Sequence, residues 1–474
     1  MESISIFEMI KIGIGPSSSH TMGPWRAAEM FLKEIELGFS LDKVVQVKVN
    51  LYGSLAKTGK GHGTDLAVLI GLTGADYTEI DTGTLMDQFN EIKNSSILNL
   101  GGKNSIPFVY EEHLVFEMNK SLPFHPNGMS FTAHFPDSEP LERTYYSVGG
   151  GFVATEHSNS MNLGAIVTPY PCHKAETIAR YCRGMNISVS DLVYLNEEAW
   201  RNKEKINSDA LNIWNEIKEC IFRGVYTRGI LPGGLGVKRR APDMNEKLLG
   251  EHVKPDSLEE WIKQIKASSH SFTAVNKWVS CFALAVNEEN AAFGRIITAP
   301  TNGASGVLPA VLMYAYCFLE NFDDEKIIRF ILTAGEIGTI FKKNATISAA
   351  MGGCQAEIGV SSSMSAAALT ECLGGSPEQV LMAAEIAMEH HLGMTCDPVG
   401  GLVQIPCIER NSMGAIKAIT ASNIALDGEP QYARVSLDDV IKTMWETALD
   451  MNSKYKETSE GGLAVQLSVN LAEC

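Results

Sequence analysis

Three cysteines stand in glycine- and proline-rich stretches of the sequence. Cys396 and Cys407 bracket the segment CDPVGGLVQIPC, and Cys354 ends the segment MGGC upstream of it. Pro398 and Gly400 prevent an ordinary helix between the pair. Small residues let the backbone approach a bulky ligand closely. The pattern is compatible with a metal site, with buried structural thiols or with a reactive catalytic thiol.

The spacing of these cysteines does not choose between the three readings. It lacks the CxxC pairs of a zinc ribbon and the closely spaced run of a bacterial ferredoxin. Ten cysteines in 474 residues do not make a disulfide scaffold. In a reducing compartment, clustered cysteines more often bind metal or catalyse a reaction. Cys474 ends the sequence, and together with the three internal cysteines it suggests a four-sulfur site.

A second group of polar residues lies in the first third of the chain. The segment GPSSSHT contains Ser17, Ser19 and His20 just before a predicted helix, where hydroxyls and free backbone N–H groups bind carboxylate or phosphate. His62 stands between two glycines, which suits either a general base near neutral pH or a surface loop. Ser147 precedes three glycines, as in a binding turn or at the end of a strand.

Two nucleotide-binding motifs are matched only superficially. GSLAKTGKG, at 53–61, has five residues between its first two glycines and no Ser or Thr after Lys60, so it is not a P-loop. GIGPSS, at 13–18, lacks the third glycine of a dinucleotide-binding fingerprint. We therefore expect neither ATP nor NAD as a ligand.

Charge and hydropathy restrict the partners of the protein. A net charge of −17 argues against nucleic acid and against an anionic membrane surface. The first residues, MESISIFEMIK, are too short and too acidic for a signal peptide, and the longest apolar run, 306–319, falls short of a membrane span. We expect a cytoplasmic protein without nucleic-acid or membrane partners. We also expect a homodimer, for which the sequence carries no specific signal.

The elements that must position these residues fall into two regions. Alternating apolar residues predict strands at 45–52 and 129–135, a third strand is expected at 143–147, and 64–72 reads as a helix. Residues 1–155 are therefore expected to form an α+β domain.

The periodicity fades over 156–175, which we assign as a linker. Residues 176–474 are expected to form a mostly α-helical domain. Capping sequences begin helices at Ser188, Ser376 and Ser436, and the first of these helices is expected to run toward Ile221. The apolar end of the chain, LAVQLSVNLAEC, is expected to fold back onto the protein.

Seven motifs taken together resemble a known family. They are GPSSSHTMGP, YGSLAKTGKGHGTD, SVGGGF, PGGLGVKRRAP, TAPTNGASG, AAMGGCQAEIGVSSSMSA and CDPVGGLVQIPC. In this order, and over nearly the whole chain, they are similar to the iron–sulfur-dependent L-serine dehydratases of bacteria in their single-chain form.

The resemblance implies a [4Fe–4S] cluster with Cys354, Cys396 and Cys407 as fixed ligands. It also implies that Cys474 reaches the active site as a displaceable fourth ligand. An iron without a fixed thiolate would then act as a Lewis acid on the hydroxyl group of the substrate, L-serine. The expected products are pyruvate and ammonium.

The resemblance also implies roles for polar residues of the first domain. We expect His62 to remove the Cα proton and Ser147 to assist. The residues expected to bind the carboxylate, amine or hydroxyl of serine are Ser17, Ser19, His20, Thr64 and Asn127. The active site is then expected between the two domains, where ligand pockets are common.

Two other functions remain compatible with the residues. One is a pyridoxal-phosphate serine dehydratase, with Lys342 or Lys343 as the Schiff-base lysine and SVGGG or TNGASG as the phosphate loop. The other is a serine-sensing regulatory protein that uses its cysteines as an oxygen sensor. Iron and sulfide analysis and an anaerobic pyruvate assay separate the three.

Overall fold

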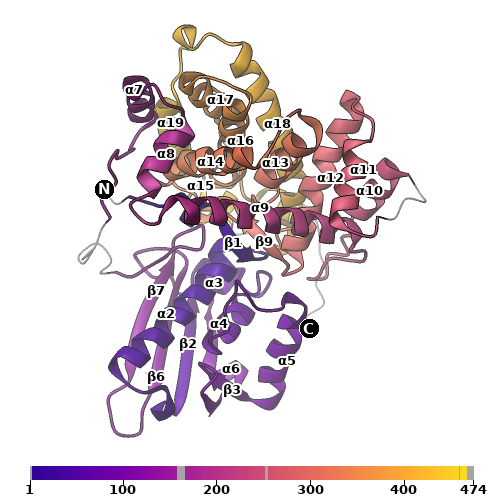
Figure 1. The fold of residues 1–474 in the computed structure, drawn as a ribbon. Coiled ribbons are helices and arrows are strands. Elements are labelled where there is room, and N and C mark those ends of the chain that lie inside the picture. Colours follow the sequence, from indigo (N-terminus) through magenta and orange to yellow (C-terminus); the bar gives the residue numbers. More distant parts are fainter. Residues whose placement is uncertain (1–2, 157–165, 251–254, 458–459, 467–474) are drawn as a thin grey trace.

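The structure is a computed structural model that describes residues 3–156, 166–250, 255–457 and 460–466. The first part of the chain mixes strands and helices, and the remainder is mostly helical (Figure 1). This confirms the predicted fold class, an α+β region followed by a mostly α-helical one. No helix among the described residues is both long enough and apolar enough to cross a membrane.

A five-stranded sheet organises the first region. Strand β2 pairs in parallel with β5 and antiparallel with β6, the central strand, and β6 and β7 are also antiparallel. The three predicted strands are present with shifts of one or two residues at their ends. In sheet order the strands are β5 (Leu114–Glu117), β2 (Gln46–Tyr52), β6 (Gly128–His134), β7 (Leu141–Ser147) and β8 (Val153–Ala154).

Helices pack against this sheet and close one hydrophobic core. Alternate residues of β2 point inward, so that Val47, Val49 and Leu51 are fully buried, as the period of a strand dictates. The predicted helix at 64–72 is present with the same bounds. The other elements here are α2 (Gly23–Gly38), α3 (Ser54–Lys57), α4 (Thr64–Leu72), α5 (Leu85–Ser95), α6 (Tyr110–His113) and the β3–β4 hairpin (Ile97–Leu100, Asn104–Pro107).

A second, two-stranded sheet joins the two regions. Strand β1 (Lys11–Ile14) pairs antiparallel with β9 (Arg295–Thr298), and both lie at the junction between the regions in Figure 1. The preceding helix α1 (Ile6–Met9) packs in the core of the helical region. The start of the chain therefore crosses into the helical region before it returns to the first sheet.

The helical region is built around α16, whose residues are almost all buried. Its small side chains, mainly serine and alanine, let α14, α17 and α18 pack closely on it. The helices are α7 (Ala175–Met185), α8 (Val189–Glu197), α9 (Lys203–Tyr226), α10 (Ala241–Leu249), α11 (Leu258–Lys266), α12 (Phe272–Ala291), α13 (Val307–Phe318), α14 (Asp324–Asn344), α15 (Ala349–Gly352), α16 (Ile358–Cys372), α17 (Pro377–Glu389), α18 (Cys407–Asp427) and α19 (Leu437–Asp450).

The predicted helix starts are confirmed, but one predicted helix is too long. Ser188, Ser376 and Ser436 each form a capping box with the third residue of their helix. The helix that begins after Ser188 was expected to run toward Ile221, which is wrong. It ends at Glu197, and Asn202 caps a separate helix, α9, by accepting a hydrogen bond from Lys205 N–H.

Candidate active site

Two histidines from different turns of the first region lie against each other. His20 belongs to a short π-helical turn, Ser18–Met22, and His62 lies in the loop before α4. Their ring centroids are 4.6 Å apart, and both side chains are buried. The two turns are cross-linked, because Thr64 Oγ1 donates to His20 O at 2.6 Å and Thr21 Oγ1 donates to His62 O at 2.7 Å. These two hydrogen bonds fix the position of the His20 turn relative to the His62 loop.

The hydrogen bonds of His62 determine which of its nitrogens is available. Nδ1 lies 2.9 Å from Thr58 O, and a carbonyl oxygen only accepts, so Nδ1 carries the proton. Nε2 then holds a lone pair, and it is buried without a hydrogen-bond partner in the described part of the chain. Burial lowers the pKa of His62 to about 4. The ring is neutral near pH 7 and able to accept a proton at Nε2.

His20 differs from His62 because both of its ring nitrogens are engaged. Nδ1 lies 2.8 Å from Ser19 Oγ, and Nε2 lies 3.0 Å from Ser54 Oγ. Ser17 Oγ accepts the His20 N–H at 3.1 Å and caps the turn. Burial, reinforced by the neighbouring His62, holds the pKa of His20 well below its usual value. The predicted residues Ser17, Ser19 and His20 therefore form one neutral, hydrogen-bonded group.

Ser147 and Asn127 form a second polar pair beside this group. Ser147 N–H donates to Asn127 O at 3.0 Å, and Asn127 Nδ2 donates to Ser147 O at 3.3 Å. The Ser147 hydroxyl and Asn127 Oδ1 are buried without partners among the described residues. Asn127 N–H donates to Nδ1 of His125, a ring close enough to His20 to contribute to lowering the pKa of that residue. Unpartnered buried polar atoms of this kind are suited to a ligand.

The three cysteines lie in the helical region, two of them at helix starts and one in a loop. Cys354 and Cys407 lie at the starts of helical turns, and Cys396 lies in the loop after α17. Gly353, which precedes the first of them, has φ = 72°, and a Cβ there would lie 2.7 Å from Met394 O. Only glycine fits this close approach without strain. All three thiols are buried, with 3–7% of each residue exposed.

The thiols influence one another strongly. A hydrogen bond from Cys396 lowers the pKa of Cys354 to about 7, against the effect of burial, and the guanidinium of Arg410 contributes. Arg410 NH1 lies 3.4 Å from Cys354 Sγ. That same hydrogen bond raises the pKa of Cys396 well above its usual value, and burial does so for Cys407. One thiolate is therefore favoured, and further thiolates require additional positive charge.

This donor set fits an iron–sulfur cluster, which is held by cysteine thiolates and brings positive charge to them. No group of three or more His, Cys, Asp or Glu side chains within the described ranges lies close enough to hold a single metal ion. An iron–sulfur cluster spreads its thiolates over several irons, so its ligands lie further apart than those of a single ion. Cys474, the predicted fourth ligand, lies outside the described residues.

The sequence did not identify Glu457, which connects the two groups. Its N–H donates to Cys396 O at 3.0 Å, and its carboxylate Oε1 lies 3.6 Å from His20 Nδ1. Burial, together with the charge of Cys354, raises the pKa of Glu457 to about 8. No motif surrounds this residue, so no local signal marks it. Arg410 was also missed, although it lies three residues after Cys407 on α18, and positions three apart share a helix face.

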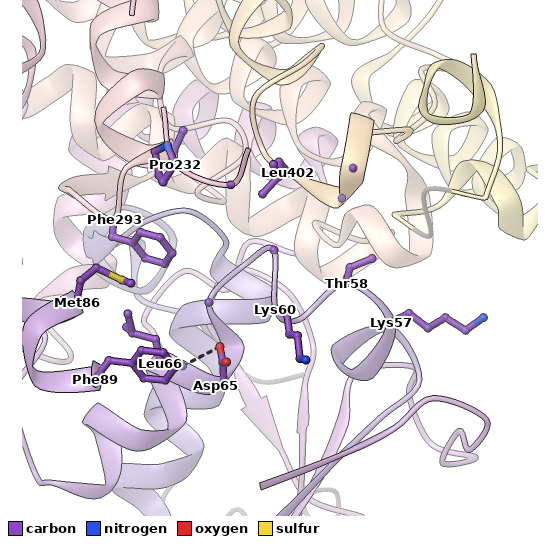
Figure 2. A pocket seen from close by; sticks show the side chains of 16 residues that line it. Lys57, Thr58, Lys60, Asp65, Leu66, Met86, Phe89, Pro232, Phe293 and Leu402 are labelled. Carbon is purple, nitrogen blue, oxygen red and sulfur yellow. Dashed lines mark hydrogen bonds between the residues drawn. The ribbon is translucent and has the colours of Figure 1, made fainter. Parts of the chain in front are cut away.

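A cavity of about 520 Å³ lies behind the His62 loop, between the two regions (Figure 2). Gly61 and Gly63 line it with their backbone, and the ring of Phe293 packs so closely that a Cβ on Gly63 would lie 2.4 Å from it. Figure 2 shows Met86, Phe89 and Phe293 on one side, and Leu402 facing them from the helical region. The cavity thus borders both the histidine loop and the loop between Cys396 and Cys407.

The two lysines considered for a Schiff base lie near the end of α14. Lys343 Nζ donates to Cys172 O at 2.9 Å, and Lys342 Nζ lies 3.6 Å from the centre of the Phe152 ring. Lys343 is thus engaged with the backbone, and Lys342 with an aromatic ring.

Comparisons with known proteins agree with the order of the two regions. A family model described as serine dehydratase beta chain matches residues 5–158, and one described as serine dehydratase alpha chain matches residues 184–464. A protein named L-serine dehydratase from Streptomyces coelicolor is 48% identical over 100% of both chains. One of the same name from Haemophilus influenzae is 45% identical over 98% of this chain and 100% of its own. L-serine dehydratase 1 of Escherichia coli is 45% identical over 98% of this chain and 99% of its own. Matches of this extent, along both regions, show that the chain belongs to the single-chain bacterial L-serine dehydratases.

Proposed function

We propose that this protein converts L-serine to pyruvate and ammonium, as a lyase that depends on a [4Fe–4S] cluster. Its relatives are named for this substrate. The observation that carries the proposal is the continuous path of contacts from Cys396 through Glu457 to His20 and His62. It joins a set of cysteine donors to a histidine whose unprotonated Nε2 has no partner among the described residues.

The chain's own residues account for the proton transfer. His62 Nε2 takes the Cα proton of serine, while Nδ1–H remains bonded to Thr58 O and holds the ring in place. The electron pair of the broken C–H bond forms the C=C bond as the hydroxyl leaves from Cβ. The proton that His62 received and the hydroxide together make water. The resulting enamine becomes an imine, which water hydrolyses to pyruvate and ammonium.

The substrate is held by the polar groups around the histidines. The hydroxyls of Ser17 and Ser19, with His20 and Thr64, surround the turn that bears the base. The unpartnered Ser147 hydroxyl and Asn127 Oδ1 offer a second set of contacts, to the carboxylate, amine or hydroxyl of serine. Burial of the whole group excludes water, which strengthens each of these contacts.

Cys354, Cys396 and Cys407 would hold the cluster, with Cys474 as the exchangeable fourth ligand. When bound, the cluster supplies a Lewis-acidic iron that assists the departure of the hydroxyl group. Arg410 partly balances the charge of the thiolates.

Anaerobic purification tests the proposal. We expect about four irons and four sulfides per chain, and pyruvate formation from L-serine in an assay coupled to lactate dehydrogenase. Cys354→Ser, Cys396→Ser and Cys407→Ser should each lower the iron content. Cys281→Ser is the matched control, because Cys281 is a buried thiol of α12 and burial raises its pKa, so it is suited to packing and not to ligation.

Two results would contradict the proposed function and favour another one. Activity in iron-free protein, with an absorption band that serine shifts and borohydride abolishes, would favour pyridoxal phosphate. Serine binding without pyruvate formation under anaerobic conditions, in protein with a full complement of iron, would favour a sensor.

A further inference from the structure

Glu457 adopts a backbone conformation that is unusual for its residue type. Its φ is +57°, in the left-handed region, where residues other than glycine and asparagine are uncommon. It is held there by the Cys396 loop: Glu457 N–H donates to Cys396 O, and Tyr455 O accepts from Cys396 N–H at 2.8 Å. Strain that the surroundings maintain in this way concentrates at functional sites. Its effect here is to direct the carboxyl group toward His20.

Among the described residues, no permanently charged cation lies within ion-pair distance of the Glu457 carboxyl group. The described residue that lies within ion-pair distance is His20, at 3.6 Å, and its pKa is held well below the usual value, so the ring is neutral near pH 7. Ser19 hydrogen-bonds the carboxyl group, but its hydroxyl carries no charge. Oε2 is buried without a hydrogen-bond partner among the described residues. A buried carboxyl group in such surroundings lacks the compensation that burial normally requires.

The substrate supplies the missing charge. We propose that Glu457 binds the α-ammonium group of the amino-acid substrate and makes the site selective for amino acids over the corresponding hydroxy acids. The inference rests on the proposed function. An ammonium group within hydrogen-bond distance favours the carboxylate form of its partner and satisfies the unpartnered oxygen. The hydroxyl groups around His20 then remain for the carboxylate of serine.

Glu457→Gln tests this because it keeps the size and removes the charge. We expect the KM for L-serine to rise about 10- to 100-fold, with kcat changed less, since a charge-assisted hydrogen bond is lost. Glu460→Gln is the matched control. It lies three residues further along the same segment, is exposed and pairs with Lys57 at 2.9 Å. Its KM should stay within twofold of the parent value, an interval of about 0.4 kcal/mol.

Selectivity separates ammonium binding from a merely structural role. L-glycerate carries a hydroxyl group where L-serine carries its ammonium group. In Glu457→Gln the ratio of the inhibition constant of L-glycerate to the KM of L-serine should fall by about tenfold or more. An unchanged ratio would overturn the inference, even with a higher KM, because a distorted site weakens both ligands alike. If the parent protein forms no pyruvate, it is the proposed function that fails.

A second variant keeps the inference testable if Glu457→Gln does not fold. Glu457→Asp keeps the charge and draws it back from His20. It should raise the KM for L-serine while retaining the selectivity ratio of the parent. Loss of selectivity in this variant, at unchanged iron content and melting temperature, would contradict the inference.

Discussion

His20 and His62 have their ring centroids 4.6 Å apart, yet only one of them has a free nitrogen. Both nitrogens of His20 face serine hydroxyls, whereas Nε2 of His62 faces none of the described polar groups. Burial lowers the pKa of each ring, so two rings in contact do not carry two charges. The pair is therefore asymmetric, with His20 as a structural and binding group and His62 as the available base.

Replacing His62 with Asn should remove the base and keep the fold. The amide can still donate to Thr58 O, but nothing replaces Nε2. We expect kcat to fall by about 10²- to 10⁴-fold, the usual contribution of a general base. Steady-state kinetics and a thermal melt measure the two effects. His113→Asn is the control, because His113 is buried in the same region and bonds to Gln46 and Val109. A decrease of less than tenfold in His62→Asn would point to another base.

The sequence located the elements that bear strong local patterns. The alternation at β2 and β6, the strand expected at β7, and the capping boxes before α8, α17 and α19 all correspond to structure. Such patterns succeed because each depends on residues only a few positions apart. The end of α8 was missed because the cap of α9, Asn202, resembles any other polar helix residue until its side chain is seen to accept from Lys205 N–H.

Features that depend on contacts between residues far apart in the sequence could not be predicted from local patterns. Strand β1 has four residues, and its partner β9 lies at the other side of the linker. Glu457 gains its position from a pairing with the Cys396 loop, a contact for which the surrounding sequence has no motif. Cys172 appeared to be a linker residue, yet it is buried and its thiol donates to Tyr170 O. In each case the decisive contact is tertiary.

His391 offers a measurable link between protonation and stability away from the active site. Its Nδ1 donates to Ala387 O at 2.6 Å, Nε2 is buried with no partner among the residues that the structure describes, and burial lowers the pKa of His391 to about 4. The unfolded chain, with a histidine pKa near 6.5, takes up the proton first as the pH falls. Stability is therefore complete above pH 6.5 and is lost progressively between pH 6.5 and 4.

Comparison with His391→Asn isolates this contribution from all other titrating groups. The free energy of unfolding of the parent, relative to that of the variant, should decline by up to about 1.4 kcal/mol per pH unit below 6.5. Urea denaturation at pH 7.5, 6.0 and 5.0 measures the difference. His270→Asn, at an exposed position, should show no such trend. A difference that does not change with pH would mean that His391 is protonated equally in both states.

Arg410→Met should make the Cys354 thiol less acidic. NH1 of Arg410 contacts Cys354 Sγ and also donates to Thr395 O at 2.7 Å, while NH2 pairs with Asp397 at 3.0 Å. Loss of the guanidinium removes one cause of the lowered pKa of Cys354. In cluster-free protein, the alkylation rate of this thiol at pH 7 should fall by about 3- to 10-fold, because less thiolate is present.

Mass spectrometry measures how fast the Cys354 thiol is alkylated, separately from the other cysteines. The iron content of anaerobically loaded protein should fall in the same variant, since a metal ligand must be deprotonated. Arg329→Met removes a guanidinium that pairs with Asp191 and Glu325, and it should alter neither quantity. An unchanged alkylation rate in Arg410→Met would assign the acidity of Cys354 to Cys396 alone.

The two threonines that cross-link the histidine turns should act together. Thr21→Val leaves His62 O without its donor, and Thr64→Val does the same to His20 O. Each change should cost about 1–3 kcal/mol of unfolding free energy, because a buried carbonyl group loses its hydrogen bond. Each should also lower kcat, since the ring of the base is no longer held in register. Thr443→Val, whose exposed hydroxyl bonds within α19, should cost much less.

The double variant shows whether the two bonds form one unit. The turns are short and touch through the two imidazole rings, so once one bond is lost the second has less to hold. The combined loss of stability should therefore be smaller than the sum of the single losses by about 0.5 kcal/mol or more, as is usual for residues in one network. Urea denaturation of the four proteins gives this coupling. Strict additivity would mean that each turn keeps its shape independently, and that the contact between the rings of His20 and His62 results from packing alone.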